Sequence, residues 1–118
     1  MNNSLISVII PVWCGRPYLT ECLNTLLGQE GVNFEVILVD NASPDDSANW
    51  LAENYPQLQL IRNQSNLGFA GACNVGINVA RGDVLLLLNQ DTRMKPGCLR
   101  ALARVFANPR IGIAGCKI

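Results

Sequence analysis

Short runs of apolar residues alternate along the chain with stretches in which apolar positions recur every three or four residues. The short runs are rich in Val, Ile and Leu and predict strands, which we place at residues 5–10, 34–39, 58–62, 84–88 and 111–114. The amphipathic stretches predict helices at residues 18–28, 44–55, 70–80 and 97–106, with Ser43 as the cap of the second. Alternation of this kind is typical of a parallel sheet with crossover helices.

Polar segments follow the apolar runs. Runs such as "EVILV" and "VLLLL" do not alternate with polar residues, which favours a sheet covered by helices on both faces. Right-handed crossovers bring the carboxyl ends of parallel strands to one edge, so "PVWCGR", "DNASPDD" and "NQDTRM" should meet there. We therefore predict an α/β fold, Rossmann-like with three α/β/α layers and a mostly parallel sheet, that binds a ligand at this edge.

Composition narrows the classes of function. The 118 residues are 49% hydrophobic and 15% charged, which is typical of one packed domain that is small for a complete enzyme. Nine basic and nine acidic residues balance, and no run of Lys or Arg occurs, which argues against nucleic acid as a partner. The absence of histidine excludes histidine-based catalysis and histidine metal ligands within this chain.

The five cysteines are widely spaced and include no CxxC pair, which favours free thiols in a reducing compartment. The first residues lack the pattern of a signal peptide, and the longest apolar run, residues 84–88, is far shorter than a membrane span. We therefore expect a cytoplasmic protein.

Asp91 is the only acid directly after the strand at residues 84–88, and it follows Asn89 and Gln90. A single carboxylate holds Mg²⁺ or Mn²⁺ when the phosphate oxygens of a ligand and water complete the shell. The alternative is that Asp91 caps the following turn, or that Asn89 and Thr92 satisfy backbone groups of the loop.

Two other strand ends carry candidate ligand contacts. Asp40 and Asn41 offer acceptors for a pyrimidine imide or for ribose hydroxyls, or else form an Asx turn that leads to the Ser43 cap. Trp13 offers a flat face for a base to stack on, or else packs in the core.

The stretch "NLGFAGACNVG" matches neither the dinucleotide fingerprint nor a P-loop. Its glycines, among them Gly68 and Gly76, allow backbone N–H groups to approach a phosphate, or allow a helix to pack closely on the sheet. Asn66 and Asn74 bind a ligand or cap local turns.

Four segments in this order resemble the family 2 glycosyltransferases of the A-type fold: "SVIIPVWCGRPYLTECLNTLL", "FEVILVDNASPDDS", "NLGFAGACNVGINVARGDVLLLLNQDT" and "MKPGCLRAL". The resemblance covers essentially the whole chain. It is strongest to the branch whose fourth strand ends in Leu-Asn-x-Asp-Thr, which includes many rhamnosyltransferases of cell-surface polysaccharide synthesis. The resemblance implies an inverting transfer of a sugar from a dTDP- or UDP-sugar, with dTDP-rhamnose as the suggested donor, to a hydroxyl of a glycan or lipid-linked acceptor.

The resemblance also implies roles for residues. Asp91 matches the acid that ligates Mg²⁺ or Mn²⁺ on the donor diphosphate. The expected nucleotide-sugar contacts lie in the matching segments, and they are Pro11, Val12, Trp13, Asp40, Asn41, Asn66, Gly68, Asn89 and Gln90. The chain departs from the commoner family pattern, which has Tyr-Asn at Trp13-Cys14 and a second acid at Asn41.

Family members are longer than this chain, and their later half carries the acceptor site and the general base. We therefore expect residues 1–118 to be the donor-binding part of a catalytic domain, with no catalytic residue of its own and the base beyond Ile118. The full-length enzyme would be cytoplasmic or peripheral at the inner face of the membrane. The alternative is a non-catalytic, self-associating module that retains the fold and forms a homodimer through an uncovered sheet edge. A dinucleotide-dependent oxidoreductase ranks lower, because "PVWCGR" stands where GxGxxG would be needed.

Overall fold

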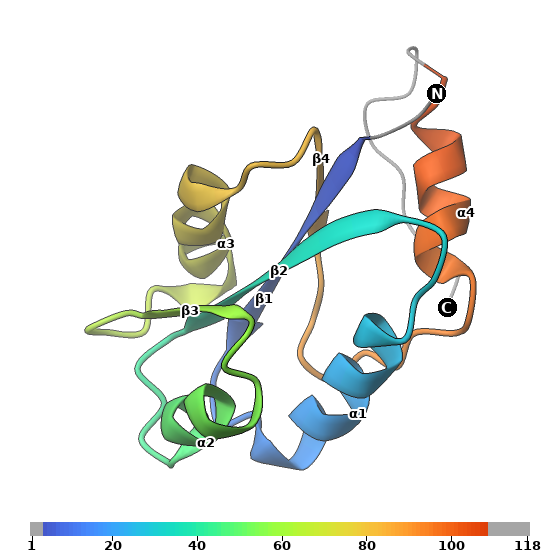
Figure 1. Cartoon of the computed structure of the whole chain (residues 1–118). Coiled ribbons are helices and arrows are strands. Elements are labelled where there is room, and N and C mark those ends of the chain that lie inside the picture. Colours follow the sequence, from blue (N-terminus) through green and yellow to red (C-terminus); the bar gives the residue numbers. More distant parts are fainter. Residues whose placement is uncertain (1–3, 109–118) are drawn as a thin grey trace.

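The computed structural model describes residues 4–108, which form a four-stranded parallel sheet with helices on both faces (Figure 1). The strands are β1 (Leu5–Val12), β2 (Asn33–Asp40), β3 (Gln59–Arg62) and β4 (Val84–Leu87). The helices are α1 (Arg16–Leu27), α2 (Ser47–Asn54), α3 (Gly68–Val79) and α4 (Cys98–Val105). The predicted order of elements is confirmed as far as residue 108, and the predicted strand at 111–114 lies outside the described residues.

The order of the strands across the sheet is β3-β2-β1-β4. The chain therefore runs outward from β1 through β2 to β3 and then returns to the other side of β1 to form β4. In this register Ile9 lies opposite both Ile37 of β2 and Leu87 of β4. The strand order reverses between β1 and β4, where open α/β sheets bind their ligands.

Two apolar layers hold the helices to the sheet. On one face, Leu19 and Leu23 of α1, Leu51 of α2 and Leu99 of α4 are all buried against the strands. On the other face, Ala72 of α3 packs in a smaller cluster that also contains Ile9, Ile37 and Val39. Figure 1 shows α3 apart from α1 and α4, on the opposite side of the sheet. The predicted three-layer arrangement is confirmed.

Strand β4 is less buried than its four leucines predict. Leu85 is 44% exposed and Leu87 is 45% exposed, whereas Leu86 and Leu88 turn toward the layer of α1 and α4. Helix α3 packs over β1 and β2, and β1 is the strand paired with β4 within residues 4–108. The prediction of cover on both faces is therefore wrong for β4, because apolar runs do not reveal how far a helix extends across a sheet.

Helix α2 begins at Ser47, so the prediction that Ser43 caps it is wrong. The Ser43 hydroxyl donates to the Asp40 carboxylate at 2.6 Å and accepts a hydrogen bond from the backbone N–H of Cys14 at 3.0 Å. Because the Ser43 hydroxyl is bonded to this carboxylate on the same turn, it is not available to cap the backbone N–H groups at the start of α2. Ser43 thus joins the end of β2 to the segment after β1.

The opposite, amino-terminal edge of the sheet is held by a buried polar network. The Ser7 hydroxyl, fully buried on β1, donates to Glu35 at 2.5 Å and accepts from the N–H of Gly82 at 2.8 Å. Glu35 also accepts from the backbone N–H of Arg81 at 2.8 Å and from its guanidinium at 3.2 Å. The network links β1, β2 and the turn before β4.

Replacement of Glu35 by glutamine is expected to cost about 1.5–3 kcal/mol of unfolding free energy at pH 7, the range for hydrogen bonds to a charged group. Burial raises the pKa of the Glu35 carboxyl, but the Ser7 hydroxyl and the Arg81 groups outweigh it and the net pKa lies below the ordinary value. A lowered folded pKa gives stability that is present above the unfolded pKa and is lost as pH falls through the folded one. Urea unfolding across the acid range should therefore show the deficit of Glu35→Gln shrinking as pH falls, whereas Glu53→Gln, on an exposed position of α2, should show little deficit at any pH.

No helix within residues 4–108 is long and apolar enough to cross a membrane. The four cysteines in this range, Cys14, Cys22, Cys73 and Cys98, form no disulfide with one another.

Candidate functional site

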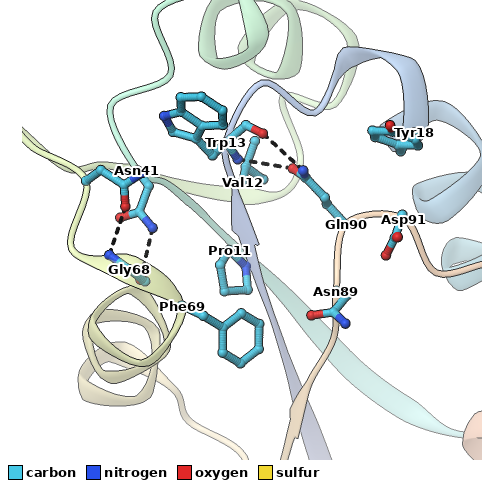
Figure 2. A pocket seen from close by; sticks show the side chains of 11 residues that line it. Pro11, Val12, Trp13, Tyr18, Asn41, Gly68, Phe69, Asn89, Gln90 and Asp91 are labelled. Carbon is cyan, nitrogen blue, oxygen red and sulfur yellow. Dashed lines mark hydrogen bonds between the residues drawn. The ribbon is translucent and has the colours of Figure 1, made fainter.

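A pocket of about 540 Å³ opens at the carboxyl edge of the sheet, where the ends of β1 and β4 meet the start of α3. Its lining comes from the segments at the ends of β1, β2 and β4, from α1, and from the loop into α3 and the first turn of α3 (Figure 2). The lining residues are Pro11, Val12, Trp13, Tyr18, Asn41, Asn66, Gly68, Phe69, Asn89, Gln90 and Asp91.

Every residue that the family resemblance assigns to the site except Asp40 lines this pocket, and Asn74, a candidate from the sequence pattern alone, does not line it. The lining residues come together because β1 pairs in parallel with β4. The N–H of Leu88 still bonds to the carbonyl of Ile9 at 2.9 Å, so the two chains leave the sheet side by side. Trp13 and Asp91 therefore face one cavity although they lie far apart in the sequence.

Two lining residues, Tyr18 and Phe69, were not predicted. Tyr18 lies in the first turn of α1 and is half exposed, and Figure 2 shows it in the same part of the pocket as Asp91. Phe69, also half exposed, lies at the start of α3 and faces Pro11 in the same view. In the sequence Tyr18 looks like a member of an amphipathic helix, and Phe69 lies just before the helix predicted at residues 70–80. The nearness of both to the polar segments of the ligand edge was the available signal.

Asp40 does not line the pocket, and its side chain builds the turn that follows β2. The residue is 3% exposed, and its carboxylate accepts hydrogen bonds from the N–H and hydroxyl of Ser43, at 3.2 and 2.6 Å. Of the two interpretations of Asp40, the geometry supports the local turn and gives no support to a direct contact with a base.

Asn41 lines the pocket, but its amide is engaged by the protein. The side-chain N–H donates to the carbonyl of Gly68 at 3.0 Å, and the side-chain oxygen accepts from the Asn63 amide at 3.0 Å and from the N–H of Leu67 at 3.2 Å. Its backbone N–H bonds to the carbonyl of Val12 at 2.8 Å. The carbonyl oxygen has two lone pairs and both are used, so Asn41 fixes the loop into α3 and has no acceptor left for a base.

Replacement of Asn41 by aspartate, the residue type of the commoner family pattern, is expected to lower the unfolding free energy by about 1–3 kcal/mol, because the new carboxylate faces the Gly68 carbonyl without a donor. Asn74→Asp, at an exposed position of α3, is the matched control and should change stability little. Thermal unfolding of both variants checks the prediction, and equal melting temperatures would contradict it.

Gln90 and Trp13 form a closed pair of hydrogen bonds. The backbone N–H of Trp13 donates to the Gln90 side-chain oxygen at 3.1 Å, and the Gln90 amide donates to the Trp13 carbonyl at 3.0 Å (Figure 2). The indole of Trp13 is 48% exposed at the pocket, so the alternative that it packs in the core is wrong. A flat aromatic face is therefore presented to a ligand.

The backbone is strained just beyond both walls of the pocket. Cys14, next to Trp13, has φ 50°, and Ala42, next to Asn41, has φ 63°. Residues other than glycine adopt this left-handed region at a cost, and such strain gathers at functional sites. The hydrogen bond from the N–H of Cys14 to the Ser43 hydroxyl helps to hold one of these turns.

The thiols near the pocket are unsuited to nucleophilic chemistry. Burial raises the pKa of the Cys22 thiol to about 11, and its sulfur lies 3.8 Å from the carbonyl of Asn89. Desolvation and the charge of Asp45 raise the pKa of Cys14 as well. Both side chains remain thiols at neutral pH, and a reactive cysteine needs the thiolate.

The side chains of Asp91, Asn89 and Tyr18 have no hydrogen-bond or ionic partner among residues 4–108, and all three line the pocket. The turn after β4 is closed by its backbone, with the N–H of Thr92 bonded to the carbonyl of Asn89 at 3.1 Å. The alternative that the Asp91 carboxylate caps this turn is therefore not supported. The carboxylate is exposed and available to a ligand.

The free side-chain oxygens of the pocket suit a hard divalent cation as ligands. Carboxylate and amide oxygens, supplied here by Asp91 and Asn89, are the ligands that Mg²⁺ and Mn²⁺ prefer. No group of three or more His, Cys, Asp or Glu side chains able to hold a metal exists within residues 4–108. A cation at Asp91 therefore needs a ligand that brings oxygens of its own.

The chain matches the model of glycosyl transferase family 2 over residues 7–118. The uncharacterized protein MT1568 of Mycobacterium tuberculosis is 40% identical to it over 93% of this chain. The uncharacterized glycosyltransferase EpsJ of Bacillus subtilis is 30% identical over 95% of this chain. The chain spans 35% of the first relative and 33% of the second, about a third of each.

Solved structures share the fold. TarS 1–349 of S. aureus aligns with a TM-score of 0.78 and 29% identity over 86% of this chain and 32% of its own, and it has also been solved in complex with UDP-GlcNAc. The mannosyltransferase PcManGT from Pyrobaculum calidifontis, in complex with GDP-Man and Mn²⁺, aligns with a TM-score of 0.81 and 26% identity over 91% of this chain and 33% of its own. The predicted fold class is thus confirmed as that of the GT-A type.

Proposed function

Because the chain belongs to glycosyl transferase family 2, we propose that its pocket binds the nucleoside diphosphate of a sugar donor for transfer to an acceptor hydroxyl. The observation that carries the proposal is the placement of a half-exposed indole and an unpartnered carboxylate, Trp13 and Asp91, in one cavity at the strand switch point. A volume of about 540 Å³ lies within the usual range of small-molecule sites.

Trp13 stacks the base, and the carboxylate of Asp91 with the amide of Asn89 orients the diphosphate through a divalent cation. The hydroxyl of Tyr18, another lining residue, donates to a phosphate or sugar oxygen. When bound, Mg²⁺ or Mn²⁺ supplies positive charge that offsets the charge growing on the leaving diphosphate. The solved complex of PcManGT with GDP-Man and Mn²⁺ supports a metal-assisted donor site.

The polar contacts to the nucleotide come from fewer side chains than the sequence suggested. The side-chain amides of Asn41 and Gln90 are hydrogen-bonded to the protein, so these residues shape the pocket. Asp40 is hydrogen-bonded to Ser43 and does not line the pocket. The amide of Asn66, whose oxygen accepts from the N–H of Gly68 at 2.8 Å, retains its own N–H groups for ribose or phosphate. Backbone groups around Pro11 and Val12 complete the contacts to the base.

The donor we propose is a pyrimidine nucleotide sugar, dTDP-rhamnose or a UDP-sugar. The first rests on the likeness of "LNQDT" to the rhamnosyltransferase branch, and the second is supported by the solved complex of TarS 1–349 with UDP-GlcNAc. Residues 1–118 act as the donor part of an inverting transferase of cell-surface polysaccharide synthesis. A glycan or lipid-linked acceptor and the general base are assigned to the portion that the longer relatives possess, at the cytoplasmic side of the membrane.

The proposal is tested by calorimetric titration of the chain with UDP, dTDP and GDP, each with and without Mn²⁺. We expect UDP and dTDP to bind, and Mn²⁺ to raise their affinity at least about tenfold. The reason is that the cation binds both the Asp91 carboxylate and the diphosphate, which otherwise repel each other. Absence of binding, or binding indifferent to Mn²⁺, would contradict the proposal.

A second candidate is a non-catalytic, self-associating module, and the exposure of Leu85 and Leu87 on β4 favours it. Apolar side chains on an open sheet edge promote pairing with another chain. Sedimentation velocity over a range of concentrations separates the candidates. A concentration-dependent dimer that binds no pyrimidine diphosphate would support the module in place of the donor site.

A further inference from the structure

Gln90 connects the end of β4 to the end of β1 through its side chain. Its side chain both accepts from and donates to the peptide groups of Trp13, at 3.1 and 3.0 Å. The last backbone bond between β1 and β4 in this direction runs from Leu88 to Ile9. The Gln90 pair therefore extends the connection between the two strands past the end of the sheet, to the level of the pocket. We call these two hydrogen bonds the Gln90 clasp.

The Gln90 clasp needs a glycine at position 15, because the Gln90 side chain packs directly against the Gly15 backbone. A Cβ atom added to Gly15 would lie 2.4 Å from the Gln90 side-chain oxygen and 2.9 Å from a methyl carbon of Leu19. Any other residue at position 15 would push the glutamine oxygen away from the Trp13 N–H. The glycine is thus required by a close approach, because its φ of −89° is open to other residues.

We propose that Gln90 is a positioning residue that holds the Trp13 platform and the Asp91 carboxylate in register before a ligand enters. The inference rests on the proposed function of the pocket. Gln90 directly precedes Asp91, so fixing its side chain on the Trp13 peptide also fixes the loop that carries the carboxylate. A preassembled pocket loses less conformational entropy on binding and therefore binds more tightly.

The Gln90 clasp accounts for the amide at this position. Glutamine supplies one donor and one acceptor at the right length, whereas glutamate supplies two acceptors, and one of them would face the Trp13 carbonyl. Asparagine has the same groups on a side chain shorter by one methylene and cannot span the same gap. If Gln90 were instead a ligand of the cation, glutamate would be the stronger ligand, because hard cations prefer charged oxygen.

The experiment uses Trp13 as its own reporter. The chain contains two tryptophans, so Trp50→Phe leaves Trp13 as the only tryptophan, and its emission is excited selectively at the red edge of the absorption band, where tyrosine does not absorb. In this background we compare Gln90→Ala, Gln90→Asn and Gln90→Glu with Asp91→Asn and with Gln57→Glu, a control at an exposed position before β3. Three quantities are measured: the Trp13 emission anisotropy without ligand, the affinity for UMP without metal, and the affinity for UDP with Mn²⁺.

We expect all three Gln90 variants to lower the anisotropy and to weaken UMP and UDP binding by about five- to tenfold, the effect of losing two neutral hydrogen bonds. Asp91→Asn should leave the anisotropy unchanged, bind UMP at least as tightly as the wild type does, and weaken UDP with Mn²⁺. Gln57→Glu should change none of the three quantities. Gly15→Ala, which displaces the glutamine oxygen without altering Gln90, should reproduce the Gln90 variants.

Two results would overturn the inference. One is a Gln90→Glu variant that keeps the anisotropy and binds UDP with Mn²⁺ as tightly as the wild type or more tightly. The other is a Gln90→Ala variant that loses affinity for UDP with Mn²⁺ alone. If the parent protein bound neither nucleotide, the proposed function would fail, and the ligand-free anisotropy would still decide whether Gln90 holds Trp13.

Discussion

Replacement of Asp91 by asparagine is expected to weaken Mn²⁺-dependent binding of UDP or dTDP on the order of a hundredfold, because a charged ligand of the cation becomes a neutral one of the same size. The Asp91 side chain has no hydrogen-bond or ionic partner within residues 4–108, so the melting temperature of the free protein should not change. Calorimetric titration and thermal unfolding of the same samples check both parts.

The control for Asp91→Asn is Asp83→Asn, a second exposed aspartate that flanks the opposite end of β4. The control should bind as the wild type does in the presence of Mn²⁺. Without metal, Asp91→Asn should bind at least as well as the wild type, since it removes a negative charge that faces the diphosphate. An equal loss of affinity with and without Mn²⁺ would contradict a role through the cation.

The second large effect is expected at Gly82, at the edge of the sheet away from the pocket. A Cβ atom there would lie 2.5 Å from the carbonyl oxygen of Leu5, 2.6 Å from the hydroxyl of Ser7 and 2.8 Å from its backbone nitrogen. Gly82→Ala therefore forces the turn away from β1 and breaks the bond from its own N–H to Ser7. We expect a loss of about 2–4 kcal/mol of unfolding free energy, the scale of overpacking combined with a broken buried network.

Urea unfolding of Gly82→Ala beside the neighbouring Asp83→Ala checks this expectation, since the exposed Asp83 side chain should be dispensable. Gly82→Ala and Asp91→Asn together also separate effects on stability from effects on binding. Folded Gly82→Ala protein should retain its affinity for UDP with Mn²⁺, whereas Asp91→Asn should retain stability and lose affinity. A melting temperature of Gly82→Ala equal to that of the wild type would show that the turn absorbs the extra methyl group.

The fold and the location of the pocket were predictable from the sequence because both follow from local patterns. Alternating strand and helix patterns imply a parallel sheet, and parallel pairing places the residues after Val12 and after Leu87 at one edge. The segments that hold Trp13 and Asp91 were recognised for that reason. No hydrogen bond between distant residues had to be known.

The roles of individual polar residues were not predictable in the same way. Gln90 bonds to Trp13 across 77 positions of the chain, and Asn41 bonds to Gly68 across 27. Sequence alone shows that these amides lie near a ligand edge, but it does not show that their donors and acceptors are already taken. A free side chain such as Asp91 and an engaged one such as Gln90 look equally suitable in the sequence.

Burial was misjudged where a pattern depends on the neighbouring element. The run from Val84 to Leu88 resembles a strand covered on both faces, yet α3 extends over β1 and β2 and leaves Leu85 and Leu87 exposed. Ser43 was misjudged for a related reason. From the sequence its hydroxyl was expected to cap a helix. In the structure the hydroxyl is hydrogen-bonded to the carboxylate of Asp40 on the same turn.

The most direct test of the central claim is a crystal structure of the chain with Mn²⁺ and UDP or dTDP, in which the anomalous signal of manganese locates the cation. The account predicts manganese in the pocket, at roughly 2.0–2.3 Å from an Asp91 carboxylate oxygen and in contact with the diphosphate, with the base against Trp13. A nucleotide bound elsewhere, or a cation held by the diphosphate while Asp91 points away from it, would contradict the account.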